Sequence, residues 1–488
     1  MQPAIRNFAL IFFASLLFHL AGTWTLPLID RDEPRFAEAS REMLQRSDYV
    51  VPYFNNGYRF DKPPLTYWFQ IASYGVFGEN DFAARFPSAV AAALTAMLIF
   101  AWGRRLDPER AAWWAAIIFT ICFQTYVHAK AAVADMWLVL FVTAAHWAGY
   151  ELLRDRLHEP VAAQAHFGPA QRRWWWIFYG ALACAFLAKG PIGWTPLLTV
   201  ALTKRFLPEV KLNRRFLFLT GIAFMLSLVA LWGIPALVRT HGEFLRVGIG
   251  YHVVGRSFGS LQGHGARTLW VYLAMLPFYF VVIFLTFFPW GFSLPWLAKK
   301  LWRQHDALDL YLISGVAVVF VIFTFVKTKL PHYTLPAFPL LALLLARTLL
   351  HYPHAERFVR RTALAAAAAG LIAAAATPFV ARFFISADLF RQAGRDVTPQ
   401  MEFGAGEYRE PSLVWYFRAR TQRWLVDLHP WEIVPFMEQP GPRFIVIRSA
   451  QVQALFPAIP ANWKTYTAHG INAAVGKPLE VTLLLKPL

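Results

Sequence analysis

The chain has 488 residues, of which 57% are hydrophobic and only 16% are charged, and its formal net charge is +18. A composition this apolar excludes a soluble protein of this length and is typical of a polytopic membrane protein. The two cysteines, Cys122 and Cys184, both lie in apolar stretches, so neither a disulfide framework nor a thiolate metal site is predicted.

Apolar stretches long enough to cross a membrane recur along the chain. A helix needs roughly 20 residues to span about 30 Å of hydrocarbon. No small-residue cleavage site follows the first stretch, so we predict a transmembrane helix there and not a signal peptide. About eleven spans are predicted, and they begin near Phe8, Phe82, Ala111, Ala131, Trp174, Ile192, Phe216, Leu269, Leu310, Tyr333 and Thr362.

Basic residues gather in the short loops on one side of these spans. Such loops are typically cytoplasmic, which places the N-terminus inside and, with an odd number of spans, the C-terminus outside. The positive charge therefore indicates membrane topology and not a nucleic-acid partner. The basic loops contain Arg104, Arg105 and Arg110; Arg154, Arg156, Arg172 and Arg173; Lys204, Arg205, Lys211, Arg214 and Arg215; Lys299, Lys300 and Arg303; and Arg357, Arg360 and Arg361.

Two domains are expected. Residues 1–385 form the transmembrane domain, and its loops 27–81 and 239–268 lie on the outer side. Residues 386–488 are less apolar and contain short β-rich runs, Arg443–Ile447 and Leu479–Leu485, between turn signals. This composition predicts a small α/β domain on the outer side.

Loop 27–81 crowds acids and bases between two apolar spans. The sequence Asp32-Glu33-Pro34 is a helix-start signal, with an acid that can cap and a proline in the first turn. From Phe36 to Leu44 apolar residues recur at helical spacing with charged residues on the other faces, which predicts a helix along the membrane interface. Two prolines after Asp61-Lys62 forbid regular helix there and fix this pair at the start of the next segment.

Ionisable residues mark the outer ends of most spans. A charge at the centre of a span costs about 2.5–3.5 kcal/mol, so charges near hydrocarbon are usually paired or functional. Their common depth predicts one polar cavity, in which cations suit a lipid phosphate and carboxylates suit acid–base chemistry or an oxocarbenium-like sugar. The residues are Asp30, Asp32, Glu33, Arg35, Asp61, Lys62, Lys130, Asp135, Lys189, His252, Arg256, Lys327, Lys329 and His332.

Six motifs, taken in order, resemble one enzyme family. D-E-P-R-F-A-E-A-S-R-E-M-L from Asp32 and D-K-P-P-L from Asp61 are similar to the first periplasmic loop of polyprenyl-phosphate-dependent GT-C glycosyltransferases. That family includes aminoarabinose lipid A transferases and protein mannosyltransferases. The other motifs are A-V-A-D-M at Asp135, L-A-K-G-P-I-G at Lys189, G-Y-H-V-V-G-R at His252 and K-T-K-L-P-H-Y-T-L-P at Tyr333, so the resemblance covers roughly residues 10–345.

The resemblance implies GT-C architecture and a role for each matched residue. Asp32 stands at the position of the catalytic carboxylate, and Asp135 is the second implied catalytic residue. The implied donor-phosphate residues are Lys62, Arg256 and Lys189; the implied cavity residues are Arg35, Glu33, Tyr333 and Lys329; and the implied metal ligands are Asp61 and His252.

This sequence departs from the family pattern twice, and several matched residues have simpler explanations. Phe36 replaces a tyrosine of the family and removes a hydroxyl, and Asp61 replaces a glutamate and shortens a metal ligand. Asp32 could only cap a helix, Lys62 could be an interfacial lysine, and His252 could be polar surface. Asp135 and Lys189 could form an ion pair that only orders the bundle.

The leading hypothesis is a glycosyltransferase of the bacterial inner membrane, with its site and its C-terminal domain in the periplasm. It would move a sugar from a polyprenyl (undecaprenyl) phosphate donor to lipid A or a related glycolipid. No cofactor is required, and a divalent metal ion is considered only at the ligands named above. The expected partners are the donor, a lipid or glycan acceptor and membrane lipids. The alternatives are a flippase of an anionic polyprenyl-linked lipid, which would place its charges at mid-membrane, and a non-catalytic scaffold.

Overall fold

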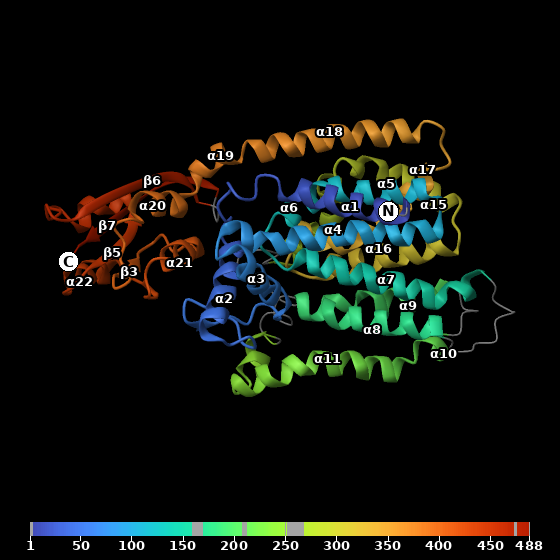
Figure 1. Ribbon diagram of the computed structural model, residues 1–488, viewed down its shortest axis with the longest axis horizontal. Coiled ribbons are helices and arrows are strands. Elements are labelled where there is room, and N and C mark those ends of the chain that lie inside the picture. The colour runs from blue at the N-terminus through green and yellow to red at the C-terminus, as the bar shows by residue number, and fades with distance from the viewer. Residues whose placement is uncertain are drawn as a thin grey trace.

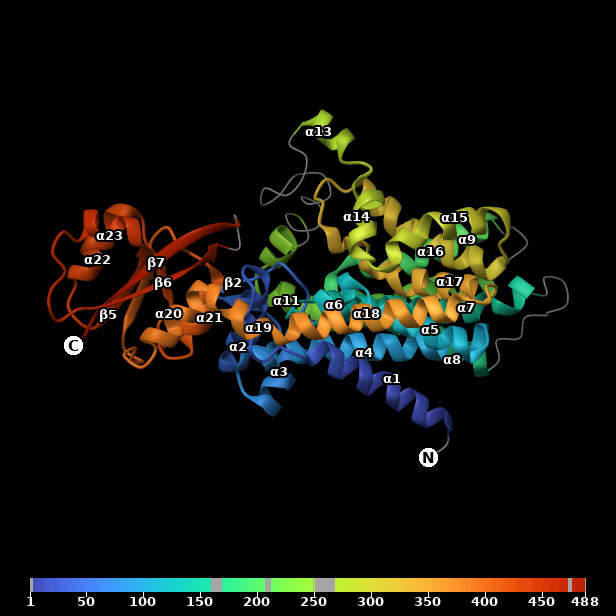
Figure 2. The same cartoon turned by 90° about the horizontal axis from the view of Figure 1, so that it is seen from above.

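The computed structural model describes residues 3–158, 169–206, 212–248, 250, 268–472 and 476–487. Helices that run roughly parallel form a bundle, and a separate C-terminal domain lies at one end of it (Figure 1). The bundle helices are α1 (Pro3–Leu20), α4 (Asp81–Leu106), α5 (Glu109–Ile121), α6 (Phe123–Ala129), α7 (Asp135–His158), α8 (Pro169–Lys189), α9 (Thr195–Phe206), α10 (Asn213–Phe216), α11 (Phe218–Arg239), α14 (Phe278–Thr286), α15 (Leu294–Arg303), α16 (Ala307–Phe325), α17 (Phe338–Leu349) and α18 (Ala355–Ala375). The short helix α13 (Leu269–Ala274) stands apart from the bundle (Figure 2).

Each predicted span lies in or next to one of these helices, but not every helix is a full span. Within the described residues, five helices are long and apolar enough to cross a membrane, namely α4, α7, α11, α16 and α18. The pair α5 and α6, bent by 64°, makes a sixth if it is one span. The helices α9 and α17 are shorter, because 3₁₀ segments that begin at Pro191 and Pro331 precede them. The number of eleven spans therefore stays a prediction.

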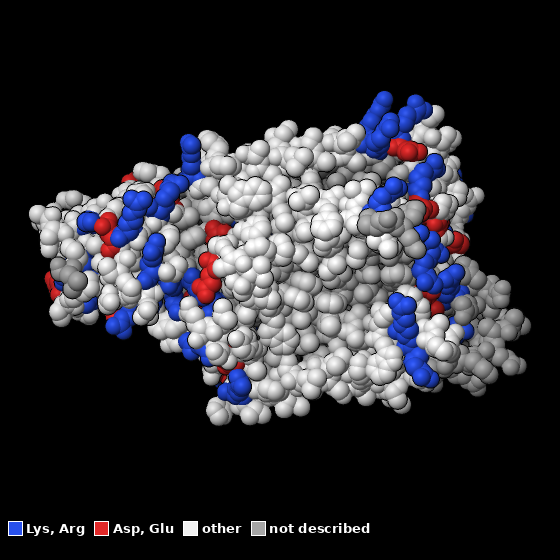
Figure 3. Space-filling view, in the orientation of Figure 1, with Lys and Arg blue, Asp and Glu red and all other residues white. Residues whose placement is uncertain are grey.

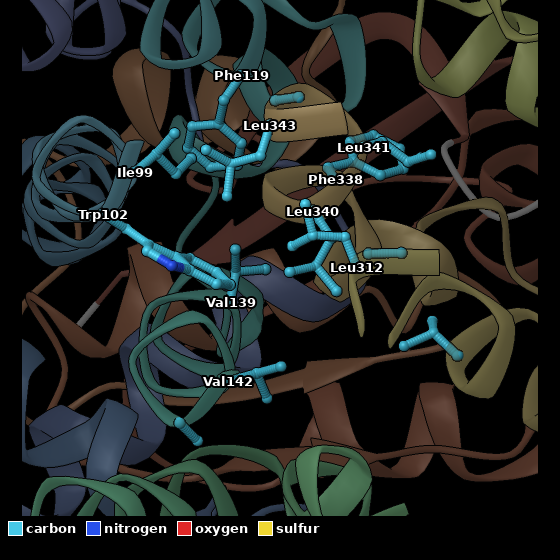
Figure 4. Close-up of a cluster of buried hydrophobic side chains, with 14 of the residues drawn as sticks. Ile99, Trp102, Phe119, Val139, Val142, Leu312, Phe338, Leu340, Leu341 and Leu343 are labelled. Carbon is cyan, nitrogen blue, oxygen red and sulfur yellow. The ribbon is translucent and has the colours of Figure 1, made fainter. Parts of the chain in front are cut away.

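Small residues allow the bundle helices to pack closely around large apolar side chains. At Gly103 of α4, an added Cβ would lie 3.0 Å from Ala112 of α5, so these two helices approach each other closely. Figure 4 shows the resulting core, in which side chains of α4, α5, α7, α16 and α17 meet. Its labelled members include Ile99, Trp102, Phe119, Val139, Val142, Leu312, Phe338, Leu340 and Leu343.

On the face of the molecule seen in Figure 3, the charged residues lie at the two ends and not along the middle. In Figure 3 a broad white band crosses the helical bundle, with lysines and arginines at one end and mixed charges over the C-terminal domain. We call these the basic end and the domain end. An uncharged band between two charged ends is the surface expected of a protein that spans a membrane.

Loop 27–81 folds at the domain end, between the bundle and the C-terminal domain (Figure 2). It forms helix α2 (Asp32–Arg46), a two-stranded hairpin of β1 (Tyr53–Phe54) and β2 (Gly57–Tyr58), and helix α3 (Leu65–Phe77). The helix predicted from Asp32 and the break predicted at the paired prolines are therefore both present.

The C-terminal domain is built on one five-stranded mixed sheet with the order β4-β3-β5-β7-β6. Strand β3 (Glu402–Ala405) runs parallel to β4 (Leu425–Asp427) and β5 (Arg443–Arg448), whereas β7 (Lys477–Lys486) runs antiparallel to β5 and β6 (Lys464–Asn472). The two β-rich runs of the sequence are thus neighbouring strands. The helices are α19 (Thr377–Val380), α20 (Ile385–Ala393), α21 (Pro411–Arg418), α22 (Ile433–Glu438) and α23 (Ser449–Leu455).

Candidate functional site

Asp32 is the first residue of α2, and its side chain is exposed. Arg31, and not Asp32, is the N-cap residue, and no side chain caps this helix. Within the described part of the chain no hydrogen bond holds the Asp32 carboxylate. The helix-cap explanation therefore does not fit, and the carboxylate is left at the positive end of the α2 dipole.

Three charged side chains of the same loop surround Asp32. Arg59 is buried, and it donates from Nη1 to Asp61 Oδ2 at 2.9 Å and from Nε to Tyr67 Oη at 3.1 Å. Arg35 interacts electrostatically with both Asp32 and Asp61, while burial and the Arg59 guanidinium lower its pKa. Asp32, Arg35, Arg59 and Asp61 thus form one group of two acids and two bases, which we call the loop cluster.

A second charged group forms where the bundle helices end. Helices α7 and α8 place Asp135, the first residue of α7, beside Lys189, the last residue of α8, at 2.5 Å between Oδ1 and Nζ. Each charge suits its own helix terminus, because acids stabilise N-termini and bases stabilise C-termini. His332 Nε2 lies 3.8 Å from Asp135 Oδ1, and the Tyr333 ring lies 5.6 Å from Lys189 Nζ. With His128, whose ring lies 4.8 Å from that of His332, these residues form the helix cluster.

Lys62 connects the two clusters. Its Nζ donates to the backbone carbonyl of Asp61 at 3.1 Å, and its charge acts on His332 of the helix cluster. Segments far apart in the sequence therefore meet here, because α2, the Asp61-Lys62 turn, α6, α7, α8 and the 3₁₀ segment Pro331–Ala337 all contribute. Of the predicted site residues, Asp32, Arg35, Asp61, Lys62, Asp135, Lys189 and Tyr333 lie in this assembly.

Several known proteins are similar to this chain in sequence. The family model described as dolichyl-phosphate-mannose-protein mannosyltransferase matches residues 7–242. An undecaprenyl phosphate-alpha-4-amino-4-deoxy-L-arabinose arabinosyl transferase of Edwardsiella ictaluri is 32% identical over 351 residues, which are 69% of this chain and 58% of the relative. One of Aeromonas hydrophila with the same name is 31% identical, over 68% of this chain and 58% of its own. The chain is thus similar in sequence to glycosyltransferases named for sugars linked to a lipid phosphate.

A solved structure extends the similarity over the whole fold. ArnT of Cupriavidus metallidurans, bound to undecaprenyl phosphate, has a TM-score of 0.76 to this chain, with 19% sequence identity and 98% of both chains covered. The GT-C fold thus includes the C-terminal domain. In contrast, the sequence alignments reach little more than half the length of the arabinosyl transferases.

Glu33 differs from the role that the GT-C resemblance implies. Its side chain is 3% exposed, and each carboxylate oxygen accepts two hydrogen bonds. Arg85 Nε and the amide of Ala132 donate to Oε1 at 2.9 and 2.6 Å, and Arg85 Nη2 and the amide of Ile29 donate to Oε2, both at 2.7 Å. Glu33 therefore joins loop 27–81 to α4 and to the turn before α7, and both of its oxygens are already used in hydrogen bonds within the protein.

Lys329 also has a structural position, because a cation fits the negative end of a helix. Its Nζ donates to the carbonyl oxygens of Phe323 and Thr324, at 2.8 and 2.6 Å, in the last turn of α16. Lys130, another of the ionisable residues at span ends, does the same for α1, where Nζ reaches the carbonyl of His19 at 3.0 Å. The expectation that Lys329 lines the substrate cavity is therefore revised: both lysines cap helices.

Two of the implied residues, His252 and Arg256, lie outside the described residues. The implied metal pair of Asp61 and His252 thus has only one described member, and Arg59 already neutralises that carboxylate. In the helix cluster, the ligand atoms of His128, Asp135 and His332 lie within 4.8 Å of one another. Lys189 already occupies Asp135 Oδ1 there, so the geometry favours an ion pair flanked by histidines over a metal site.

Sequence reasoning missed Arg59, Arg85 and His128. Arg85 had a signal, because an arginine inside a predicted span requires a partner, which is Glu33 here. Arg59 and His128 had no such signal, since their spacing alone does not distinguish them from other polar residues near a membrane surface.

Proposed function

We propose that the chain transfers a sugar from a polyprenyl (undecaprenyl) phosphate donor to lipid A or a related glycolipid on the periplasmic side of a bacterial inner membrane. One observation carries the proposal: the exposed Asp32 carboxylate, which has no hydrogen bond within the described residues, stands beside a chain of cations that runs from Arg35 through Lys62 to Lys189. Such an arrangement suits a phosphate leaving group and a nucleophile side by side.

The names of the relatives support the choice of donor and acceptor. The arabinosyl transferases of Edwardsiella and Aeromonas carry undecaprenyl phosphate in their names, and the ArnT structure contains that lipid phosphate. The first loop of this chain resembles the aminoarabinose branch, which acts on lipid A. The basic end would be cytoplasmic by the distribution of positive charge, which puts the site and the C-terminal domain in the periplasm.

The chemistry follows from these positions. An oxygen of the acceptor attacks the anomeric carbon of the sugar, the bond from that carbon to the donor phosphate breaks, and the polyprenyl phosphate leaves with the electron pair. Lys62 and Lys189, assisted by Arg256, stabilise the leaving phosphate. Asp32 accepts the proton of an attacking hydroxyl, whereas a phosphate acceptor is already ionised and is only oriented by Asp32. Asp135 holds the Lys189 ammonium in place.

Purified protein in detergent tests this assignment. With an undecaprenyl-phosphate-linked aminoarabinose and lipid A, Asp32→Asn and Lys62→Ala should each abolish transfer while the protein stays inserted and folded. Lys300→Ala, which removes a lysine at the basic end, is the matched control and should keep wild-type activity. Near-normal transfer by either site variant would refute the assignment.

Two further arms of the same assay separate the remaining alternatives. A flippase would move the donor lipid across vesicles without breaking its sugar–phosphate bond, so release of free undecaprenyl phosphate marks transfer. Dialysis against EDTA tests the divalent ion proposed at Asp61 and His252: activity that is lost and then restored by added metal would support that ion, and unchanged activity would argue against it.

A further inference from the structure

The charged face of α2 is covered by a helix of the C-terminal domain. Glu38, Arg41 and Glu42 are each at most 1% exposed, although their spacing in the sequence is that of a solvent-facing side. Helix α21 lies against this face, and both helices lie where the bundle meets the C-terminal domain (Figure 1). Burial of so many charges requires specific partners, and the partners are unusual.

The first contact caps α21 from another part of the chain. Glu410, the N-cap residue of α21, makes no side-chain cap bond, and Pro411 has no N–H group. The first free donor is therefore the amide of Ser412, which donates to Asp30 Oδ1 at 2.9 Å, while the Ser412 hydroxyl donates to Asp30 Oδ2 at 2.5 Å. Asp30 thus supplies the cap that α21 lacks.

In the second contact, each of the two helices places an arginine against the other. Arg418, the last residue of α21, pairs with Glu38 and lies 3.4 Å from Glu42 Oε1. In return, Arg41 of α2 donates to the carbonyl oxygen of Trp415 at 2.8 Å, and its guanidinium lies 4.4 Å from the centre of the Trp415 ring. The start and the end of α21 are therefore each fixed to the segment that carries the site.

Asp32 lies between the two contacts in the sequence, two residues after Asp30 and six before Glu38. Its own carboxylate has no hydrogen bond within the described residues, so the backbone of this segment and the charges of Arg35 and Arg59 determine where it points. The neighbouring Glu33 joins the segment to α4, and Asp30 and Glu38 join it to α21. The position of Asp32 therefore depends on the contacts of Asp30 and Glu38 with α21.

We propose that α21 positions the Asp32 carboxylate, with Ser412 and Arg418 as positioning residues that act through Asp30 and Glu38. This inference rests on the proposed function, because it assigns the C-terminal domain a part in the same sugar transfer. A displacement of about 1 Å at a reacting group can lower a rate by about 10²-fold, so loosening this turn should lower kcat. Binding of the donor phosphate should change little, since Lys62 and Lys189 lie on other segments.

Steady-state kinetics of four variants test the proposal. Asp30→Ala removes both bonds to Ser412 and should lower kcat by about 10²-fold with the KM for the lipid-linked sugar unchanged. Asp30→Asn should restore most of kcat, because an amide accepts from the Ser412 N–H and donates to the hydroxyl. Ser412→Ala keeps the backbone bond to Asp30 but removes the hydroxyl contacts with Asp30 and Ser386, and it should have a smaller effect of the same kind. Asp396→Ala is the matched control: it breaks a carboxylate contact with Lys464 in the same domain but away from α21.

Wild-type kcat in both Asp30→Ala and Ser412→Ala would overturn the proposal. An equal loss in Asp396→Ala would also overturn it, since it would show general loosening of the domain. If Asp30→Ala does not fold, Ser412→Ala and Asp30→Asn decide, because both keep the backbone bond. Failure of the proposed function is distinguishable, because the wild-type protein would then not consume the lipid-linked sugar at all.

Discussion

Two buried ion pairs of this protein, Glu33–Arg85 and Asp135–Lys189, use the same chemistry for different ends. Glu33 accepts four hydrogen bonds, so both oxygens are saturated and its partner is fixed. Asp135 holds Lys189 with one oxygen, and within the described residues His128 and His332 lie close to it without a hydrogen bond to its carboxylate.

This difference in hydrogen bonding distinguishes an ion pair that holds the fold together from one that belongs to a functional site. A buried charge is costly unless pairing and hydrogen bonding are complete, so full satisfaction, as at Glu33, is what a structural joint requires. At Asp135 and Lys189 the hydrogen bonding is incomplete, and Lys62 lies nearby as a further cation. This arrangement leaves room for an anionic group of a substrate. The following changes test whether the two pairs differ in this way.

The largest effect on stability is expected at the saturated pair. Glu33→Ala leaves the Arg85 guanidinium buried without its partner, which should lower the free energy of unfolding by about 3–5 kcal/mol. Chemical denaturation in detergent measures this, with Glu109→Ala as control, since the exposed Arg104–Glu109 pair is expected to contribute at most about 1 kcal/mol. Similar losses in the two variants would contradict the comparison.

For the pair Asp135–Lys189 we expect a large loss of activity and a smaller loss of stability. Lys189→Met removes an ammonium that is proposed to stabilise the leaving phosphate, so kcat should fall on the order of 10²-fold. Stability should fall less than in Glu33→Ala, because His128 and His332 remain beside Asp135. If Lys189→Met unfolded the protein and left the activity of the folded fraction unchanged, Lys189 would be structural.

Stability should also depend on pH at the contact with α21. Burial, opposed by the bonds from Ser412, raises the pKa of Asp30 to about 7, and burial beside Glu38 raises that of Glu42 to about 7. In the unfolded chain such groups titrate near 4 to about 4.5. A raised folded-state pKa gives stability that is complete below the unfolded value and lost as the pH rises through about 7. The unfolding free energy should therefore fall over this range, and Asp30→Asn should flatten the fall.

The smallest effect is expected at a lysine that only caps a helix. Lys329→Met removes a cation from the last turn of α16, which should cost roughly 1 kcal/mol of stability. Because the hydrogen bonds of Lys329 within the described residues all go to backbone carbonyls, the KM for the lipid-linked donor should not change. A raised KM would place Lys329 in the substrate site instead.

Much of the fold is legible in the sequence, because apolar length and charge each reflect the membrane directly. The start of α2 at Asp32 and the break at Pro63-Pro64 follow from local stereochemistry. The bend at Cys122 does not, since an average over a window cannot detect it. The packing of α21 against the charged face of α2 also does not follow from local sequence, because α21 lies about 370 residues later in the chain.

The site could be predicted only as far as its residues differ from structural ones in pattern. Asp32 and Lys62 precede prolines that fix them, and Lys189 ends a span, so their positions carried a signal. Glu33 and Lys329 are an acid and a base at similar places in the sequence. Their hydrogen bonds, which no sequence pattern reveals, give them a structural role. Only the three-dimensional structure separates a satisfied charge from an available one.

Mass spectrometry of membrane lipids tests the central claim most directly. Cells that lack the gene are compared with the same cells carrying the wild-type gene or the Asp32→Asn variant at equal protein levels. We predict that a lipid A or related glycolipid species gains the mass of one sugar only with the wild-type gene. The same gain with Asp32→Asn, or no lipid difference between cells with and without the wild-type gene, would contradict the account.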